Sequence, residues 1–280
     1  MNDSDLLMVM SIRPEEYKLS DLRSQKPFHG KNQEGGGVFQ SIDEVVFKNS
    51  KSSKEEIEFL TPNPVGLLLH VYQESKRRTE EIFEEFCQKI TEEEFNKGTD
   101  KFISFTKKIY DYINEFQKTI LFGYSALETF INISIPEDYS YSVYDNKGIT
   151  NVYDKRAIER WISTSIKLSD VLVDIYKTPS IKNKKIWTYF KNFEEFRNEI
   201  IHLKTDDKKY YHKYFKRNNL IPLSIPVDIM NFFFEKRENK EITNPMWPWV
   251  VDAKNDFPVM KEFDSNILKV VGNVHSGKME

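Results

Sequence analysis

The stretch "FEEFRNEIIH", Phe193 to His202, predicts a helix with two different faces. Its apolar residues recur at intervals of three and four, which is the spacing along one side of an α-helix. They are Phe193, Phe196, Ile200 and, just beyond the stretch, Leu203. Asn198 and His202 lie four residues apart, so they stack roughly opposite this stripe, and Arg197 lies on the flank between the faces. We therefore expect a buried apolar stripe and a polar trio that points away from it.

The polar trio contains side chains that can cleave RNA without a metal. Because histidine gains and loses a proton near neutral pH, His202 can act as a general base or acid. The guanidinium of Arg197 stays charged and can hold a phosphate while charge develops on it. Since the trio points away from its own core, it needs a second surface, such as a partner subunit, to form a cleft. The plainer alternatives are that His202 is a structural histidine and that Arg197 pairs with Glu194, one turn earlier.

The composition is that of a folded chain with balanced charge. Of its 280 residues, 39% are hydrophobic and 14% aromatic, which is enough to bury a sizeable core. The formal net charge is only -3, so any affinity for RNA has to come from local patches. The single cysteine, Cys87, excludes an intrachain disulfide, and the histidines show no metal-ligand spacing, so we expect neither a metal nor a cofactor. With no basic leader and no apolar run of about eighteen residues, we expect a cytoplasmic protein without membrane contact.

Helical periodicity runs through the middle of the chain, and we assign residues 65–238 to an all-α domain, a bundle of four to five helices. The predicted helices run from Pro64 to Ile90, from Thr99 or Asp100 to Ile131, from Asp154 to Ile175, from Ile181 to Lys204 and from Val227 to Lys236. In the third helix the predicted core face comprises Ile158, Trp161, Ile162, Ile166, Val171 and Ile175. Gly123 in the second helix predicts close packing against a neighbouring helix.

The two ends of the chain lack this periodicity. Residues 1–64 contain "GKNQEGGGVFQ" and "KNSKSSKEE", which predict loops around short apolar pieces and hence an irregular accessory region. Residues 239–280 form a C-terminal extension, irregular apart from "NILKVVGNV", which can form a short strand. A polar connector is predicted from Glu137 to Tyr153.

The segment after the polar trio, "KTDDKKYYHKYFKR" from Lys204 to Arg217, mixes lysines with aromatic rings. Lysines bind phosphates and rings stack on bases, so the segment is a candidate RNA contact. The candidate residues are Lys204, Lys208, Lys209, Tyr211 and Lys213. The alternative is that the aromatic residues pack this loop onto the bundle while the lysines are merely solvated. The sequence leaves both interpretations open.

Two stretches resemble the HEPN superfamily (higher eukaryotes and prokaryotes nucleotide-binding). "FEEFRNEIIH" is similar to the family's signature of an Arg, four to six residues and a His, here with Asn198 directly after Arg197. "LFGYSALETFIN", Leu121 to Asn132, resembles an earlier core helix in which a small residue, Leu, Glu and an aromatic residue recur. The resemblance implies a HEPN-like all-α bundle, a homodimer that brings two signatures together, and metal-independent RNA cleavage that leaves a cyclic phosphate and a 5′-hydroxyl.

The resemblance also implies roles for single residues. His202 would take the proton from the ribose 2′-hydroxyl or give one to the leaving 5′-oxygen, and Arg197 would bind the scissile phosphate. Asn198 would orient His202 or the phosphate, and the second subunit would supply the complementary copies. Glu128 would face the same pocket, although capping or pairing with a lysine explains it equally well.

The biological role implied by the resemblance is that of a toxic effector. Such an endoribonuclease would belong to a toxin–antitoxin or anti-phage defence system, with tRNA, mRNA or rRNA as substrate and an antitoxin or defence protein as partner. Some toxin members carry a modifiable Tyr two residues after the His, but that position is Lys204 here, so this form of control is not expected. The alternative is a non-catalytic HEPN-like helical module that binds nucleotide, RNA or a protein partner through the same surface.

Overall fold

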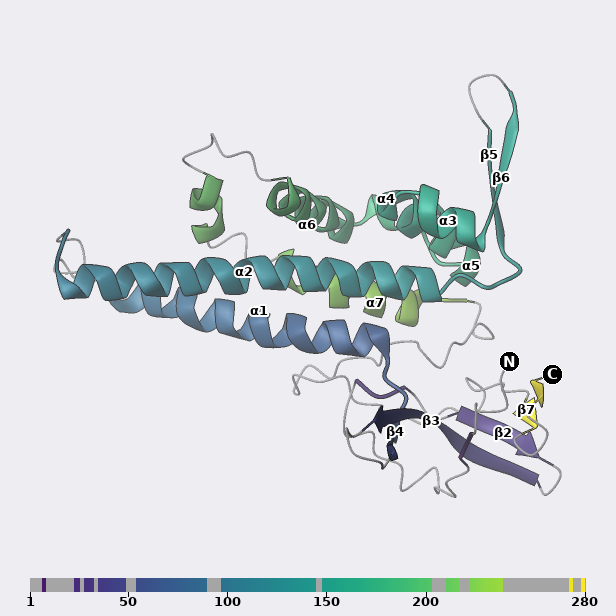
Figure 1. Cartoon of the computed structure of the whole chain (residues 1–280). Coiled ribbons are helices and arrows are strands. Elements are labelled where there is room, and N and C mark those ends of the chain that lie inside the picture. The colour runs from purple at the N-terminus through teal and green to yellow at the C-terminus, as the bar shows by residue number, and fades with distance from the viewer. Residues whose placement is uncertain are drawn as a thin grey trace. The chain divides into compact units, whose positions relative to one another are not determined.

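The structure is a computed structural model of the chain, and most of its described residues are helical, which confirms the predicted fold class (Figure 1). It describes residues 7–8, 23–25, 28–32, 35–48, 54–89, 97–144, 148–202, 210–216, 222–238, 272–273 and 278–279. Its contacts divide the chain into two compact units. The first comprises Met1–Leu67, Phe130–Thr178 and Phe233–Glu280, and the second Leu68–Thr129 and Pro179–Phe232. None of the described helices has the length and hydrophobicity that a span across a bilayer requires.

Two long helices, α1 (Pro64–Lys89) and α2 (Asp100–Ile133), supply much of the second unit and lie side by side (Figure 1). The start of α2 follows the predicted signals, because Gly98 has a φ of 89° and the Thr99 hydroxyl accepts a hydrogen bond from the Phe102 N–H at 3.2 Å. In α1, which was predicted without a cap, the Asn63 side chain accepts a hydrogen bond from the Val65 N–H at 3.0 Å. At the start of each helix, a polar side chain just before it therefore accepts a hydrogen bond from an N–H group that has no partner within the helix.

The second unit also contains α6 (Lys185–Ile201), the 3-10 segment η5 (Tyr210–Phe215) and most of α7 (Ile225–Lys236). Their shared core is aromatic. Phe116 of α2 stacks on Tyr214 with ring centres 4.4 Å apart and meets Phe196 edge-on at 5.5 Å. The Tyr112 hydroxyl donates to the backbone carbonyl of Tyr214, which ties η5 to α2. Buried aromatic rings therefore pack η5 against α2 and α6.

Gly123 is a point of close packing in the second unit, as its position in α2 predicted. A Cβ atom on this residue would lie 2.8 Å from Cδ2 of Tyr72 in α1. It would also lie 3.0 Å from Cζ of Phe193 in α6 and 3.0 Å from Cγ of Pro226 in α7. Because only glycine leaves this space, α2 approaches three elements at one residue.

The third predicted helix is interrupted in the structure. It consists of α3 (Lys155–Trp161), α4 (Thr164–Ile166), the π-helical turn η3 (Lys167–Val171) and α5 (Leu172–Tyr176). The predicted start of this helix is confirmed, since Asp154 is the N-cap of α3 and its carboxylate accepts from the Ala157 N–H at 2.8 Å. The predicted core face is wrong for Trp161, which is 67% exposed, and for Ile166, which is 39% exposed. The break before Ser163 and the wide π-turn shift the helical phase, so a single period cannot describe both halves.

Strands occur in three described regions outside the predicted helices. The predicted connector from Glu137 to Tyr153 contains an antiparallel hairpin, with Ser142 opposite Val152. Its strands are β5 (Ser140–Tyr144) and β6 (Thr150–Asp154). In the N-terminal region β3 (Gly35–Lys48) pairs antiparallel with β1 (Leu7–Met8), β2 (Phe28–Asn32) and β4 (Lys54–Leu60). The glycine run predicted to be a loop lies within β3, where Gly37 is paired with Gly30 of β2. The C-terminal region contributes the short pair β7 (Gly272–Asn273) and β8 (Lys278–Met279).

Candidate functional site

The helix with the polar trio is α6, and it ends at the histidine. After a 3-10 turn, η4 (Ile181–Asn183), the α-helix runs to Ile201, and His202 is its C-cap, with its N–H donating to the Asn198 carbonyl at 2.9 Å. The predicted end at Lys204 lies outside the described residues, as does Leu203. Phe193 is completely buried, Phe196 nearly so and Ile200 only partly, whereas Asn198 and His202 are exposed. The apolar stripe and the polar face therefore lie on the predicted sides of the helix.

Arg197 lies on the flank of α6, where its guanidinium meets an aromatic ring instead of a carboxylate. Its Cζ atom is 5.0 Å from the ring centre of Tyr124 in α2, and its Nη1 donates to Oδ1 of Asn198 at 3.0 Å. Glu194, the alternative partner for Arg197, accepts from the Tyr124 hydroxyl at 3.2 Å and pairs with Lys191. Among the described residues, no ion pair between Arg197 and a carboxylate is found.

Asn198 and His202 line a groove of about 640 Å³. Its lining comprises Lys191, Asn192, Glu194, Glu195, Asn198, Glu199, His202, Tyr210 and Lys213. Both lysines are engaged, Lys191 with Glu194 and Lys213 with Glu199, and the exposed Glu195 adds a further negative charge. The groove thus carries no surplus of positive charge. Neither Arg197 nor Glu128, the candidate pocket residue of α2, belongs to this lining.

In the described part of the segment proposed to bind RNA, some side chains are packed in the core and others are exposed. Tyr210 and Tyr214 are buried, so for these two rings the packing alternative describes what is found. Tyr211 is 38% exposed and leans edge-on against both of them. Lys213 lies with Nζ 4.8 Å from the ring centre of Tyr210, and its partial burial lowers its pKa, although the charge of Glu195 acts in the opposite direction. The candidates Lys204, Lys208 and Lys209 lie outside the described residues.

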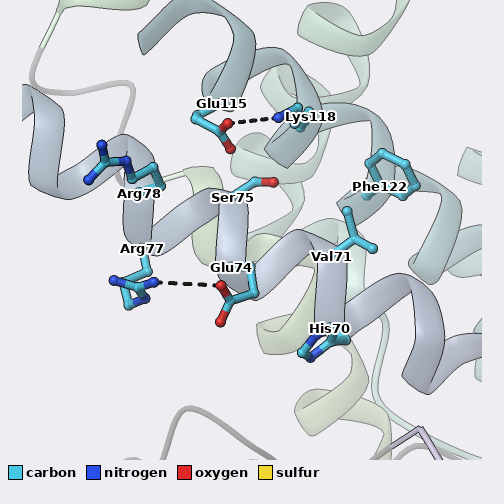
Figure 2. Close-up of a pocket in the computed structure, with 9 residues that line it drawn as sticks. All are labelled: His70, Val71, Glu74, Ser75, Arg77, Arg78, Glu115, Lys118 and Phe122. Carbon is cyan, nitrogen blue, oxygen red and sulfur yellow. Dashed lines mark hydrogen bonds and ion pairs between the residues drawn. The ribbon is translucent and has the colours of Figure 1, made fainter. Parts of the chain in front are cut away.

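A second groove of about 530 Å³ lies on α1 and α2, and Figure 2 shows its lining. Its cations are all paired with carboxylates: Arg77 with Glu74 at 3.5 Å and with Glu81 at 2.6 Å, Arg78 with Glu81, and Lys118 with Glu115 at 2.7 Å. Cations that are already paired offer little to a phosphate, so this groove is a weaker candidate than the end of α6.

The sequence analysis missed one residue of the site, Tyr124. From the sequence we predicted only that Tyr124 lies within the second helix, and it is 5% exposed in the structure. Its ring nevertheless faces Arg197, and its hydroxyl reaches Glu194, two residues of the signature stretch. The signal available was indirect, because Tyr124 lies inside "LFGYSALETFIN", the second stretch that resembles the HEPN superfamily.

Comparison with family models, with curated proteins and with solved structures finds no match for this chain. Among the described residues, no group of three or more His, Cys, Asp or Glu side chains is placed to hold a metal ion. The end of α6 offers the exposed imidazole of His202, the guanidinium of Arg197, which lacks a carboxylate partner among the described residues, and the amide of Asn198, which contacts that guanidinium. These groups can hold a phosphate and move a proton.

Proposed function

We propose that this chain is a metal-independent endoribonuclease of the HEPN type. The observation that supports this most is the pairing of Arg197 with the Tyr124 ring at the end of a helix whose exposed cap is His202. A guanidinium held by a ring keeps its full charge, whereas one held by a carboxylate is neutralised before a phosphate arrives. The resemblance of "FEEFRNEIIH" to the HEPN signature supports the same assignment.

In the proposed reaction the ribose 2′-oxygen attacks the adjacent phosphorus while the bond to the 5′-oxygen breaks. One histidine takes the 2′-hydroxyl proton and a second group gives a proton to the leaving 5′-oxygen, so the products are a cyclic phosphate and a 5′-hydroxyl. Arg197 stabilises the charge on the phosphate oxygens. Asn198 accepts from Arg197 through Oδ1, so its amide N–H groups can donate to the phosphate or toward His202.

A homodimer would complete the proposed site. One chain offers a single histidine at the end of α6, whereas the reaction needs both a base and an acid. Two α6 ends brought together would supply two copies of His202 and of Arg197. In the cell we propose a cytoplasmic toxic effector of a toxin–antitoxin or anti-phage defence system that cuts tRNA, mRNA or rRNA and is controlled by an antitoxin or defence protein.

The carboxylates of the groove favour a second candidate, a non-catalytic module that binds a protein partner. Glu194, Glu195 and Glu199 all line the groove beside His202 and would repel a phosphate placed inside it. A basic segment of a partner protein would fit such a lining better. In the ribonuclease proposal the phosphate must instead lie on the Arg197 side of α6, outside this groove.

The test is induced expression of the wild-type chain and of His202→Ala, with growth recorded and total RNA analysed for new 5′-hydroxyl ends. His212→Ala is the matched control, because His212 is also exposed but does not line the groove. We expect growth arrest and new ends from the wild type and from His212→Ala, and neither from a folded His202→Ala protein. New ends that persist in His202→Ala would contradict the assigned residue. Purified wild-type protein that binds a partner and cuts no RNA would favour the binding module.

A further inference from the structure

We propose that Tyr124 is a positioning residue of this site, which fixes the guanidinium of Arg197 and keeps its charge available to the scissile phosphate. This inference rests on the proposed function. It starts from two contacts of one buried side chain: the ring of Tyr124 lies with its centre 5.0 Å from Cζ of Arg197, and its hydroxyl donates to Oε1 of Glu194 at 3.2 Å.

The first contact places the cation. A guanidinium near the face of a tyrosine is attracted by the ring's electron density, and the attraction grows as water is excluded. Tyr124 is 5% exposed, and its neighbour Gly123 is enclosed by three elements, so the ring has little room to turn. An otherwise flexible arginine side chain is thereby restricted before any RNA binds, which lowers the cost of ordering it in the transition state.

The second contact protects the charge. Glu194 lies three residues before Arg197 on α6, a spacing at which a carboxylate and a guanidinium can pair. In the structure the Glu194 carboxylate is instead bound by the Tyr124 hydroxyl and by Lys191. The same tyrosine therefore holds Arg197 with its ring and, with its hydroxyl, engages the carboxylate that has the spacing to pair with Arg197.

Two substitutions separate these contacts. Tyr124→Phe keeps the ring and removes the hydroxyl, so Glu194 becomes able to turn toward Arg197. Tyr124→Leu removes both the ring and the hydroxyl. For Tyr124→Leu we expect kcat to fall about fivefold to thirtyfold with a much smaller change in KM, because the lost interaction acts on charge that develops in the transition state. For Tyr124→Phe we expect a smaller fall that Glu194→Gln reverses.

The experiment uses the purified full chain and a short RNA substrate. Tyr124→Leu is measured alone and combined with Arg197→Ala, and the thermal midpoint of each variant is recorded. Phe122→Leu is the control, since Phe122 is an aromatic residue of the same helix that lines the separate groove of Figure 2. If Tyr124 acts through Arg197, Tyr124→Leu causes no further loss in the Arg197→Ala background. An equal loss in both backgrounds, or unchanged cleavage by Tyr124→Leu, would overturn the proposal.

A second measurement remains informative if the wild type cuts no RNA and the proposed function fails. The Arg197 side-chain Nε–Hε resonance, assigned by its absence in Arg197→Lys, should be displaced by the ring current of Tyr124 and return toward the ordinary arginine position in Tyr124→Leu. A resonance that is the same in both proteins would show that the ring does not hold the guanidinium. Displacement without RNA cleavage would retain the positioning contact and reject the ribonuclease.

Discussion

Gly123→Ala tests the close packing on which the position of α6 depends. The added methyl group would meet Tyr72, Phe193 and Pro226 at 2.8 to 3.0 Å, nearer than carbon atoms normally approach. None of the three can move easily: Tyr72 and Phe193 are buried rings, the Tyr72 hydroxyl donates to the Leu223 carbonyl, and Pro226 is a closed ring. Overpacking of this kind costs about 1–3 kcal/mol, and three simultaneous contacts place this site at the upper end of that range.

Helix propensity opposes this cost, because alanine is favoured over glycine in a helix interior by about 1 kcal/mol. We therefore expect a net loss of about 2 kcal/mol in the free energy of unfolding, measured by urea titration followed by far-ultraviolet circular dichroism. Ser125→Ala is the matched control, since Ser125 is exposed on the same helix and its replacement should be neutral or slightly stabilising. If Gly123→Ala is as stable as Ser125→Ala, the close approach of the three elements does not exist.

Two further predictions concern a cap and a buried hydroxyl. Asp154→Ala removes the acceptor of the Ala157 N–H and should destabilise α3 by about 1 kcal/mol. Hydrogen exchange at the Ala157 amide should then be roughly fivefold faster. Asp154→Asn, which retains an acceptor, should keep this amide protected. Burial raises the pKa of Tyr112 and of Tyr214 in the folded protein. The two neutral hydroxyls therefore contribute to the free energy of unfolding at pH values below about 10, the pKa of an unfolded tyrosine, and this contribution is lost as the pH rises above it. Urea midpoints should fall in alkaline solution, and less steeply in Tyr112→Phe; an unchanged slope would contradict the assignment.

A helix could be predicted from the sequence where one hydrophobic period runs through its whole length and a neighbouring side chain caps its start. α2 follows one apolar period and begins directly after Thr99, whose hydroxyl caps it. Its start and, within two residues, its end could therefore be predicted from neighbouring residues. The region from Asp154 to Tyr176 could not, because an early stop and a π-turn change the phase within it. Lys167 shows the consequence: it is buried, with Nζ donating to the Glu159 carbonyl at 2.8 Å and to Oδ1 of Asn132 at 2.9 Å.

The candidate site could be predicted only in its local part. The spacing along α6 determined that Asn198 and His202 share an exposed face and that Arg197 lies beside it. Which side chain of α2 meets Arg197 depends on how two helices pack, and the hydrogen bond from Tyr124 to Glu194 joins residues 70 positions apart in the chain. Periodicity within one helix contains no information on that contact.

The charges around α6 explain why an aromatic partner matters for the proposed reaction. Three glutamates share α6 with Arg197: Glu194, Glu195 and Glu199. Of these, Glu194 has the three-residue spacing at which a carboxylate can pair with the guanidinium. Lys191 engages the first and Lys213 the last, while the guanidinium is held by a neutral ring and a neutral amide. A carboxylate in place of Tyr124 would hold Arg197 as firmly and cancel the charge that a phosphate needs. In the proposed site, the uncharged ring that α2 contributes at Tyr124 therefore lets a guanidinium on a glutamate-rich stretch of α6 remain available to a phosphate.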